Sequence, residues 1–216
     1  MKKIIVFLIL GSVFMSCAKE GYVAEIEENV AVISTKFGDM VVEFYSDVAP
    51  MHVESFTILA NEGYFDGTTF HRVIPGFVIQ GGDPNSKDDD RMNDGTGGRA
   101  GKFFGVGREN DPSTWTIPAE FNDSLHIKGT LSMARSQNPN SGSSQFFICQ
   151  APTPQLNGKY TVFGQVIKGL DVIDKIVNVD RPNKDNPSYG GPDGDNPFEK
   201  VTMTVKIMKQ SQAIAD

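Results

Sequence analysis

The segment FHRVIPGFVIQGGDP, residues 70–84, is the most unusual stretch of the sequence. Two apolar runs of β-rich composition flank Pro75 and Gly76, a turn pair in which glycine supplies the positive φ that other residues avoid. Arg72 and Gln80 are long polar side chains set among these apolar residues. On a half-buried strand an arginine is ordinarily a solvated residue of the outer face, so the strand pattern alone assigns it no function.

The strand pattern continues on both sides of this segment, and it predicts a mainly β fold. The expected strands are 30–34, 40–45, 68–74, 77–80, 129–134, 145–149, 160–166 and 201–208. Two helices are expected, at 48–62 and 170–177. Pro50 suits the first turn of the earlier helix, and Gly63 follows as a stop signal. Many short strands with only two helices favour a barrel or a sandwich.

Three further segments strengthen the pattern: LSMA at 131–134, SQFFIC at 144–149 and TVFGQV at 161–166. Together with residues 70–84, and in this order along the chain, they resemble the cyclophilin family of peptidyl-prolyl cis–trans isomerases. The likeness runs from about residue 30 to residue 208. It implies a closed eight-stranded antiparallel β-barrel that is capped by two α-helices, with the active groove on the outer face of the barrel.

The resemblance also implies a set of site residues. Carried over by position, the catalytic residues are Arg72, Gln80 and Phe77. The residues implied to bind the peptide substrate are Val78, Ala134, Arg135, Gln145, Phe147, Leu156 and Tyr160. Val78, Arg135 and Tyr160 differ from the commonest residues of the family, and Gln155 stands where an aromatic residue, often tryptophan, is usual. These departures leave catalysis in place but put binding of cyclosporin in doubt.

The residue types suit rotation about an X–Pro bond. Amide resonance holds that bond planar behind a barrier of about 18–20 kcal/mol, and the twisted amide has a pyramidal, more basic nitrogen. A fixed guanidinium such as that of Arg72 favours the twisted form over the planar one. Gln80 can donate to the carbonyl oxygen of residue X, while Phe77, Phe147 and Leu156 anchor the prolyl ring. No bond is made or broken, so we expect no cofactor and no metal.

Composition excludes several other classes of protein. The formal net charge is −7 and the isoelectric point is about 5.0, so a phosphate-neutralising surface is not expected and neither is a nucleic-acid partner. Ser143 and Ser144 have no His–Asp set beside them in the sequence. Cys149 lies in an apolar run, where a free cysteine is usually a small core residue. By strand alternation, His71 points away from Arg72 and is expected to be structural.

The N-terminus has the pattern of a bacterial lipoprotein signal. Positive Lys2 and Lys3 precede an apolar run that is too short to span a bilayer, and Cys17 follows. The pattern predicts a signal peptide at 1–16, lipid attachment at Cys17 and a tether at 17–29. The isomerase domain is then expected at 30–209 and a C-terminal tail at 210–216. Because Ala18 follows the cysteine, we expect a lipid-anchored monomer of the bacterial cell envelope, on the outer membrane, facing the periplasm or the cell surface.

The expected function is therefore isomerisation of X–Pro bonds in exported or unfolded polypeptides. One alternative is a noncatalytic module or holdase that grips proline-containing segments; the retention of both Arg72 and Gln80 argues against it. A ligand-carrying barrel of the lipocalin type would account for the strands but not for residues 70–84. The sequence assigns no role to the acidic loops 84–100 and 184–197, and it does not identify client proteins.

Overall fold

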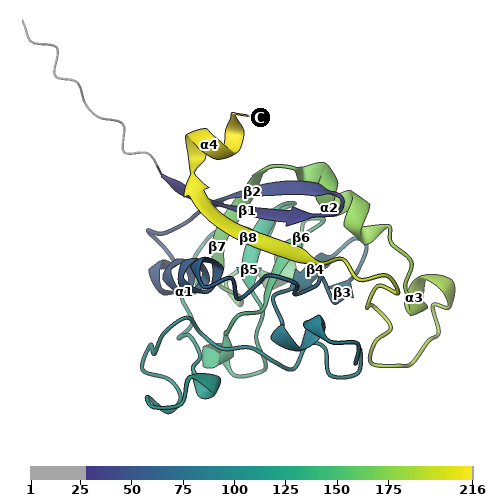
Figure 1. Cartoon of the computed structure of the whole chain (residues 1–216), viewed down its shortest axis with the longest axis horizontal. Coiled ribbons are helices and arrows are strands. Elements are labelled where there is room, and N and C mark those ends of the chain that lie inside the picture. The colour runs from purple at the N-terminus through teal and green to yellow at the C-terminus, as the bar shows by residue number, and fades with distance from the viewer. Residues whose placement is uncertain (1–27, 216) are drawn as a thin grey trace, which may run out of the picture.

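The short apolar runs form eight strands in the computed structural model, which describes residues 28–215. The strands belong to one sheet, and every pair of neighbouring strands is antiparallel (Figure 1). They are β1 (Asn29–Thr35), β2 (Gly38–Phe44), β3 (Arg72–Val73), β4 (Val78–Gly81), β5 (Thr130–Met133), β6 (Phe146–Cys149), β7 (Val162–Lys168) and β8 (Met203–Lys209). The expectation of a mainly β fold with eight antiparallel strands is confirmed.

The sheet is an open half-barrel, so the expectation of a closed barrel is wrong. The strand order is β3-β4-β6-β5-β7-β2-β1-β8, which leaves β3 and β8 at the two edges. The expected strand 68–74 is reduced to the two residues of β3. The chain just before β3 meets the start of β8 at a single bridge, Thr69 with Thr202, beside a 3.0 Å bond from the Phe70 amide to the Val201 carbonyl. A strand of two residues is too short to continue this contact as a ladder.

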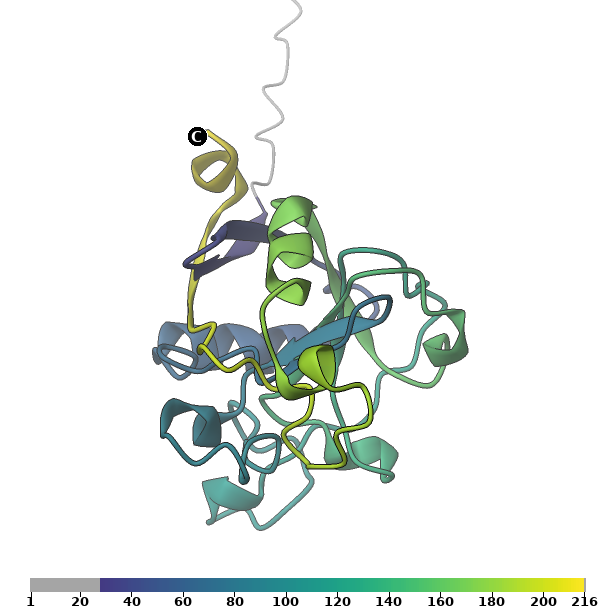
Figure 2. The same ribbon diagram turned by 90° about the vertical axis from the view of Figure 1, so that its right-hand side faces the viewer.

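The inner face of the sheet carries the main hydrophobic core. Helix α1 (Pro50–Asn61) packs against β7 and β8, whereas α2 (Leu170–Val177) packs against β2 and β4 (Figures 1 and 2). Both expected helices are thus present. The described chain also has two short helices, α3 (Pro182–Asp185) and α4 (Gln210–Ile214), that were not expected. It contains the 3₁₀ turns η1 (Pro84–Lys87), η2 (Pro112–Thr114), η3 (Pro139–Ser141) and η4 (Pro154–Leu156).

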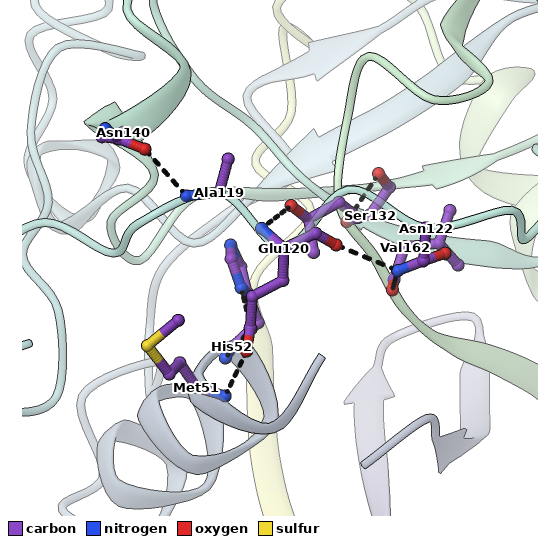
Figure 3. A network of polar contacts seen from close by, with 9 residues as sticks. Met51, His52, Ala119, Glu120, Asn122, Ser132, Asn140 and Val162 are labelled. Atoms are coloured by element: carbon purple, nitrogen blue, oxygen red, sulfur yellow. Dashed lines mark hydrogen bonds and ion pairs between the residues drawn. The ribbon is translucent and has the colours of Figure 1, made fainter. Parts of the chain in front are cut away.

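Helix α1 takes its N-terminal cap from a distant loop. The preceding residue, Ala49, has no side chain that can accept a hydrogen bond from the first turn. Instead, the amides of Met51 and His52 donate to the two carboxylate oxygens of Glu120, each at 3.0 Å (Figure 3). His52 Nδ1 lies 2.6 Å from Glu120 Oε2. A carboxylate at a helix N-terminus satisfies unpaired amides and interacts favourably with the helix dipole.

The same loop also contacts the sheet. Asn122 Nδ2 donates to the Val162 carbonyl of β7 at 2.9 Å, and the Ala119 amide donates to Asn140 Oδ1 of the turn η3 at 3.0 Å (Figure 3). The long connection between β4 and β5 is thus fixed to both α1 and the sheet.

Within residues 28–215, no helix is both long and apolar enough to cross a bilayer. The expected signal peptide 1–16, lipid attachment at Cys17 and all but the last two residues of the tether 17–29 lie outside the described residues.

Candidate active site

Strand register places the central polar residues of the site side by side. Arg72 on β3 lies opposite Gln80 on β4, and Gln80 lies opposite Phe147 on β6. Because side chains alternate between the two faces of a strand, all three project from the outer face. Their neighbours Val73 and Phe146 are buried in the main core on the inner face. The outer-face position that the sequence predicts for Arg72 therefore sets it beside two other predicted site residues.

A chain of hydrogen bonds orients Arg72. Arg72 Nη1 donates to Gln80 Oε1 at 3.3 Å, and Gln80 Nε2 donates to Gln145 Oε1 at 3.0 Å. Gln145 Nε2 in turn donates to the Gly97 carbonyl at 2.7 Å. Each amide is thereby fixed in one orientation, because its donor and acceptor ends have different partners. The relay leads from the guanidinium to the backbone of the glycine-rich loop at 95–98.

Apolar side chains form a notch next to the guanidinium. Val78 and Phe147 are buried in a small cluster on the outer face of the sheet, and Phe77, Leu156 and Tyr160 pack against it. The Phe147 and Tyr160 rings meet edge to face, with centroids 5.8 Å apart. The notch thus has one buried aromatic floor and partly exposed walls, the arrangement expected where an apolar ring is to be held.

Two charged residues border the notch. The guanidinium carbon of Arg72 lies 6.0 Å from the centre of the Phe77 ring. That of Arg135 lies 4.4 Å from the centre of the Tyr160 ring, and its nitrogens donate to the Lys159 carbonyl at 2.7 and 3.2 Å. The Arg135 side chain is therefore held against the wall that carries Tyr160. Arg72 faces the notch, and one of its N–H groups donates to Gln80.

These features enclose a cavity of about 120 Å³. Its lining consists of Arg72, Phe77, Val78, Gln80, Ala134, Arg135, Phe147, Leu156 and Tyr160. All of these belong to the set expected from the sequence, and the remaining member, Gln145, contacts the cavity through Gln80. The structure therefore brings the whole predicted set together; the individual roles stay predictions.

The charge of Arg72 is not neutralised by a neighbouring acid. Among residues 28–215, no ion pair is formed between its guanidinium and a carboxylate, and its side-chain partner is the neutral Gln80. No cluster of three or more metal-ligating acidic, histidine or cysteine residues occurs in the described chain. Cys149 is buried below the notch, and burial raises the pKa of its thiol to about 11. A thiolate is therefore disfavoured, as expected for a structural cysteine.

His126 is a residue of this site that the sequence did not reveal. Its ring stacks on Phe147 with centroids 5.9 Å apart and an interplanar angle of 18°. Its Nε2 lies 3.0 Å from Ser132 Oγ and its Nδ1 lies 3.1 Å from Asn157 Oδ1. Burial lowers the pKa of His126, which favours the neutral ring. A lone histidine in a loop gives no signal of this contact, because only the fold sets it under Phe147.

Comparison with protein families gives one consistent result. Residues 30–193 match the model of the family "Cyclophilin type peptidyl-prolyl cis-trans isomerase/CLD". A probable peptidyl-prolyl cis-trans isomerase of Brucella abortus (strain 2308) is 44% identical over 149 residues, covering 69% of this chain and 71% of that protein. A peptidyl-prolyl cis-trans isomerase of Schizosaccharomyces pombe is 40% identical over 161 residues, covering 72% of this chain and 89% of that protein.

Solved structures agree with the sequence relatives. A cyclophilin-type peptidyl-prolyl cis-trans isomerase of Cryptosporidium parvum, determined in the presence of the dipeptide Ala-Pro, has a TM-score of 0.67 and 29% sequence identity. The similarity covers 84% of this chain and 99% of that chain. The fold, the sequence relatives and the family match thus point to the same class of protein.

Proposed function

Since the chain belongs to the cyclophilin-type peptidyl-prolyl cis–trans isomerase family, we propose that the notch beside Arg72 is where it rotates X–Pro bonds. The observation that carries this proposal is the shared cavity. One space of about 120 Å³ is bordered by a guanidinium that forms no ion pair with any described acidic residue and by the apolar side chains of Phe77, Phe147 and Leu156. A proline and the imide bond that precedes it need both features at once.

The proposed mechanism is preferential stabilisation of the twisted amide. As the X–Pro bond rotates, conjugation is lost and the nitrogen lone pair becomes a hydrogen-bond acceptor. An Arg72 N–H that points at this nitrogen interacts more strongly with the twisted form than with the planar form, so the barrier falls. The relay through Gln80 and Gln145 holds the guanidinium before substrate arrives, so little reorganisation accompanies the rotation.

The apolar notch holds the prolyl side of the X–Pro bond in place during the rotation. Burial of the prolyl ring against Phe147 and Leu156 holds the ring while the preceding carbonyl turns. The Gln80 amide accepts from Arg72 through its oxygen and carries N–H donors on its nitrogen, and Ala134 also lines the cavity. We propose that these groups position residue X and its neighbours, with proline-containing polypeptides as substrates. The Ala-Pro dipeptide present with the Cryptosporidium relative supports this substrate class.

Replacing the guanidinium tests the mechanism. In a proline-peptide isomerisation assay, Arg72→Ala should lower kcat/KM by about 10²–10³-fold, the effect of losing one preorganised donor at a transition state. Arg108→Ala is the matched control, because that arginine is exposed and pairs with Asp111. Peptide binding by Arg72→Ala should fall much less than its turnover. Unchanged kcat/KM in Arg72→Ala would refute the mechanism, and suppression of client aggregation without turnover would indicate a holdase.

We further propose that the domain acts as a lipid-anchored monomer of the bacterial envelope, on exported or unfolded polypeptides. The support is the sequence of the N-terminus, with Cys17 after a short apolar run. Metabolic labelling with a fatty acid should mark the wild-type protein and leave Cys17→Ser unlabelled. Label that survives the substitution would rule out lipid at this cysteine, without bearing on the isomerase activity.

A further inference from the structure

A second cavity lies beside the catalytic notch and shares Arg72 and Gln80 with it. Its volume is about 280 Å³, far more than one water molecule needs. His71 contributes to its lining, and its outer walls come from the loops at 91–95 and 192–196. These are parts of the acidic loops to which the sequence assigned no role. A peptide that enters the notch therefore passes next to this cavity.

The two loops are joined into one wall by a dense set of hydrogen bonds. Arg91 donates to the carbonyls of Asn196, at 2.7 Å, and Pro197, and its Nε lies 3.2 Å from Asp193 Oδ2. Asn196 Nδ2 donates to Asp94 Oδ2 at 2.6 Å. The N–H groups of the Arg91 guanidinium therefore have their partners within the wall. The cavity is preformed, because its two sides hold each other in place.

The cavity presents buried polar atoms that have no partner. His71 is only 5% exposed, and the Thr69 backbone is the polar group nearest its ring, but neither ring nitrogen has a well-aligned hydrogen-bond partner among residues 28–215. Its Nε2 is directed toward the loop at Gly95, where a Cβ would come within 3.6 Å of it. Oδ1 of Asp94 is likewise buried and unpaired. Buried polar atoms are almost always hydrogen-bonded, so these atoms indicate a site that a ligand completes.

The charge of the lining selects the ligand. The acidic residues are Asp94, Asp193 and Asp195, and the basic residues are Arg72 and Arg91. Arg91 and Asp193 pair with each other. Arg72 is held by Gln80 beside the Phe77 ring and faces the notch. Within the described part of the chain, the carboxylates of Asp94 and Asp195 thus form no ion pair, although Asp195 accepts a hydrogen bond from Asn183. Burial lowers the pKa of His71, so its neutral ring adds one acceptor.

We propose that this cavity is a subsite for a basic side chain, lysine or arginine, of a residue close to the target proline in the substrate. Its cationic end donates to Asp94 Oδ1 and to the acceptor nitrogen of His71, while the backbone of the same peptide crosses the notch. This inference rests on the proposed isomerase function and adds a substrate preference to it. Segments with one lysine or arginine at the matching position near the proline are then the preferred substrates.

Paired peptides test the preference. In an Ala-Pro host peptide, lysine or glutamine is placed at each of the three positions before and after the proline, and kcat/KM and the binding constant are measured. The wild type should favour lysine by about tenfold at one of these positions. In Asp94→Asn, which retains an acceptor for Asn196, the lysine-to-glutamine ratio should fall to about one. Asp89→Asn removes an exposed charge from the same loop and should keep the wild-type ratio.

Each outcome has a separate meaning. Equal rates for lysine and glutamine peptides at every position would overturn the subsite while leaving the isomerase function in place. Absence of turnover with all peptides would instead contradict the proposed function. A preference that Asp89→Asn reduces as much as Asp94→Asn would show a diffuse charge effect and refute the subsite. Thermal unfolding checks that Asp94→Asn is folded, and Asp195→Asn provides an independent second variant.

Discussion

The two faces of the same strands do opposite work in this protein. On the inner face, Ile79 of β4 and Phe146 of β6 are fully buried in the main core. On the outer face, their neighbours Val78, Gln80 and Phe147 line the notch beside Arg72. Because side chains alternate with a period of two, one residue along the strand separates the packed core from the working surface. Any one-residue slip of register would exchange the two.

The two faces also differ in how tightly their side chains are packed. The inner face packs the rings of Phe56, Phe65 and Phe146 against one another, with centroids 4.8 to 5.8 Å apart. The outer face leaves a small cavity unfilled and places the unpaired charge of Arg72 at its edge. We therefore expect truncations on the inner face to affect mainly stability, and truncations around the notch to affect mainly the proposed activity.

The largest effect that tests this division is on stability. Phe146→Ala should lower the free energy of unfolding by about 3–5 kcal/mol, the usual cost of truncating a buried aromatic residue. Phe147→Ala, one residue away, removes the floor of the notch; it should lower stability less than Phe146→Ala does, and it should raise KM for proline peptides. Chemical denaturation and the isomerase assay together measure both. A stability loss in Phe147→Ala equal to that in Phe146→Ala would break the distinction between the faces.

A smaller effect is expected on the outer face alone. Gln145→Ala removes the acceptor for Gln80 Nε2 and the donor to the Gly97 carbonyl. With its orientation relaxed, Gln80 should hold Arg72 less well, and kcat/KM should fall about tenfold, which corresponds to about 1.4 kcal/mol. Gln137→Ala, in an exposed loop, is the control. The relay would have no role in catalysis if the two variants turned over substrate equally well.

The smallest effect concerns the helix that covers the inner face. Burial by itself would raise the pKa of Glu120, but hydrogen bonds from the His52 ring and from the Met51 and His52 amides lower it overall. A lowered pKa in the folded state stabilises the fold above the unfolded pKa of about 4.5, and this contribution is lost as the pH falls through the folded pKa. Glu120→Gln should therefore be about 1 kcal/mol less stable at pH 7, with a difference that shrinks at acid pH.

The control for this prediction is Glu62→Gln, whose carboxylate is half-exposed and pairs with Arg99 on the surface. Neither substitution should change kcat/KM for proline peptides, since neither residue lines the notch. A stability difference for Glu120→Gln that stayed constant down to pH 3 would show that the carboxylate does not carry the charge-dependent part of the helix cap.

Strand positions followed from local patterns and the site residues from the family resemblance, but closure and capping followed from neither. The strand pattern around Arg72 predicted an outer face, and the register of β3 with β4 put Gln80 opposite it. By contrast, only two residues of the expected strand 68–74 form a ladder, and the contact with β8 is limited to the isolated bridge between Thr69 and Thr202. Nor does any local signal identify Glu120 as the cap of α1, because 69 residues separate it from Met51.

The sequence by itself determined the family, the period-two division of each strand and the identity of the residues around the notch. These are local properties: a motif, an alternation and a choice of side chains. Only the tertiary structure decided that the sheet stays open, that His126 stacks beneath Phe147, and that loops about a hundred residues apart enclose a second cavity at His71. The physical reason is that such contacts depend on how distant segments pack, and no short-range pattern in the chain records that packing.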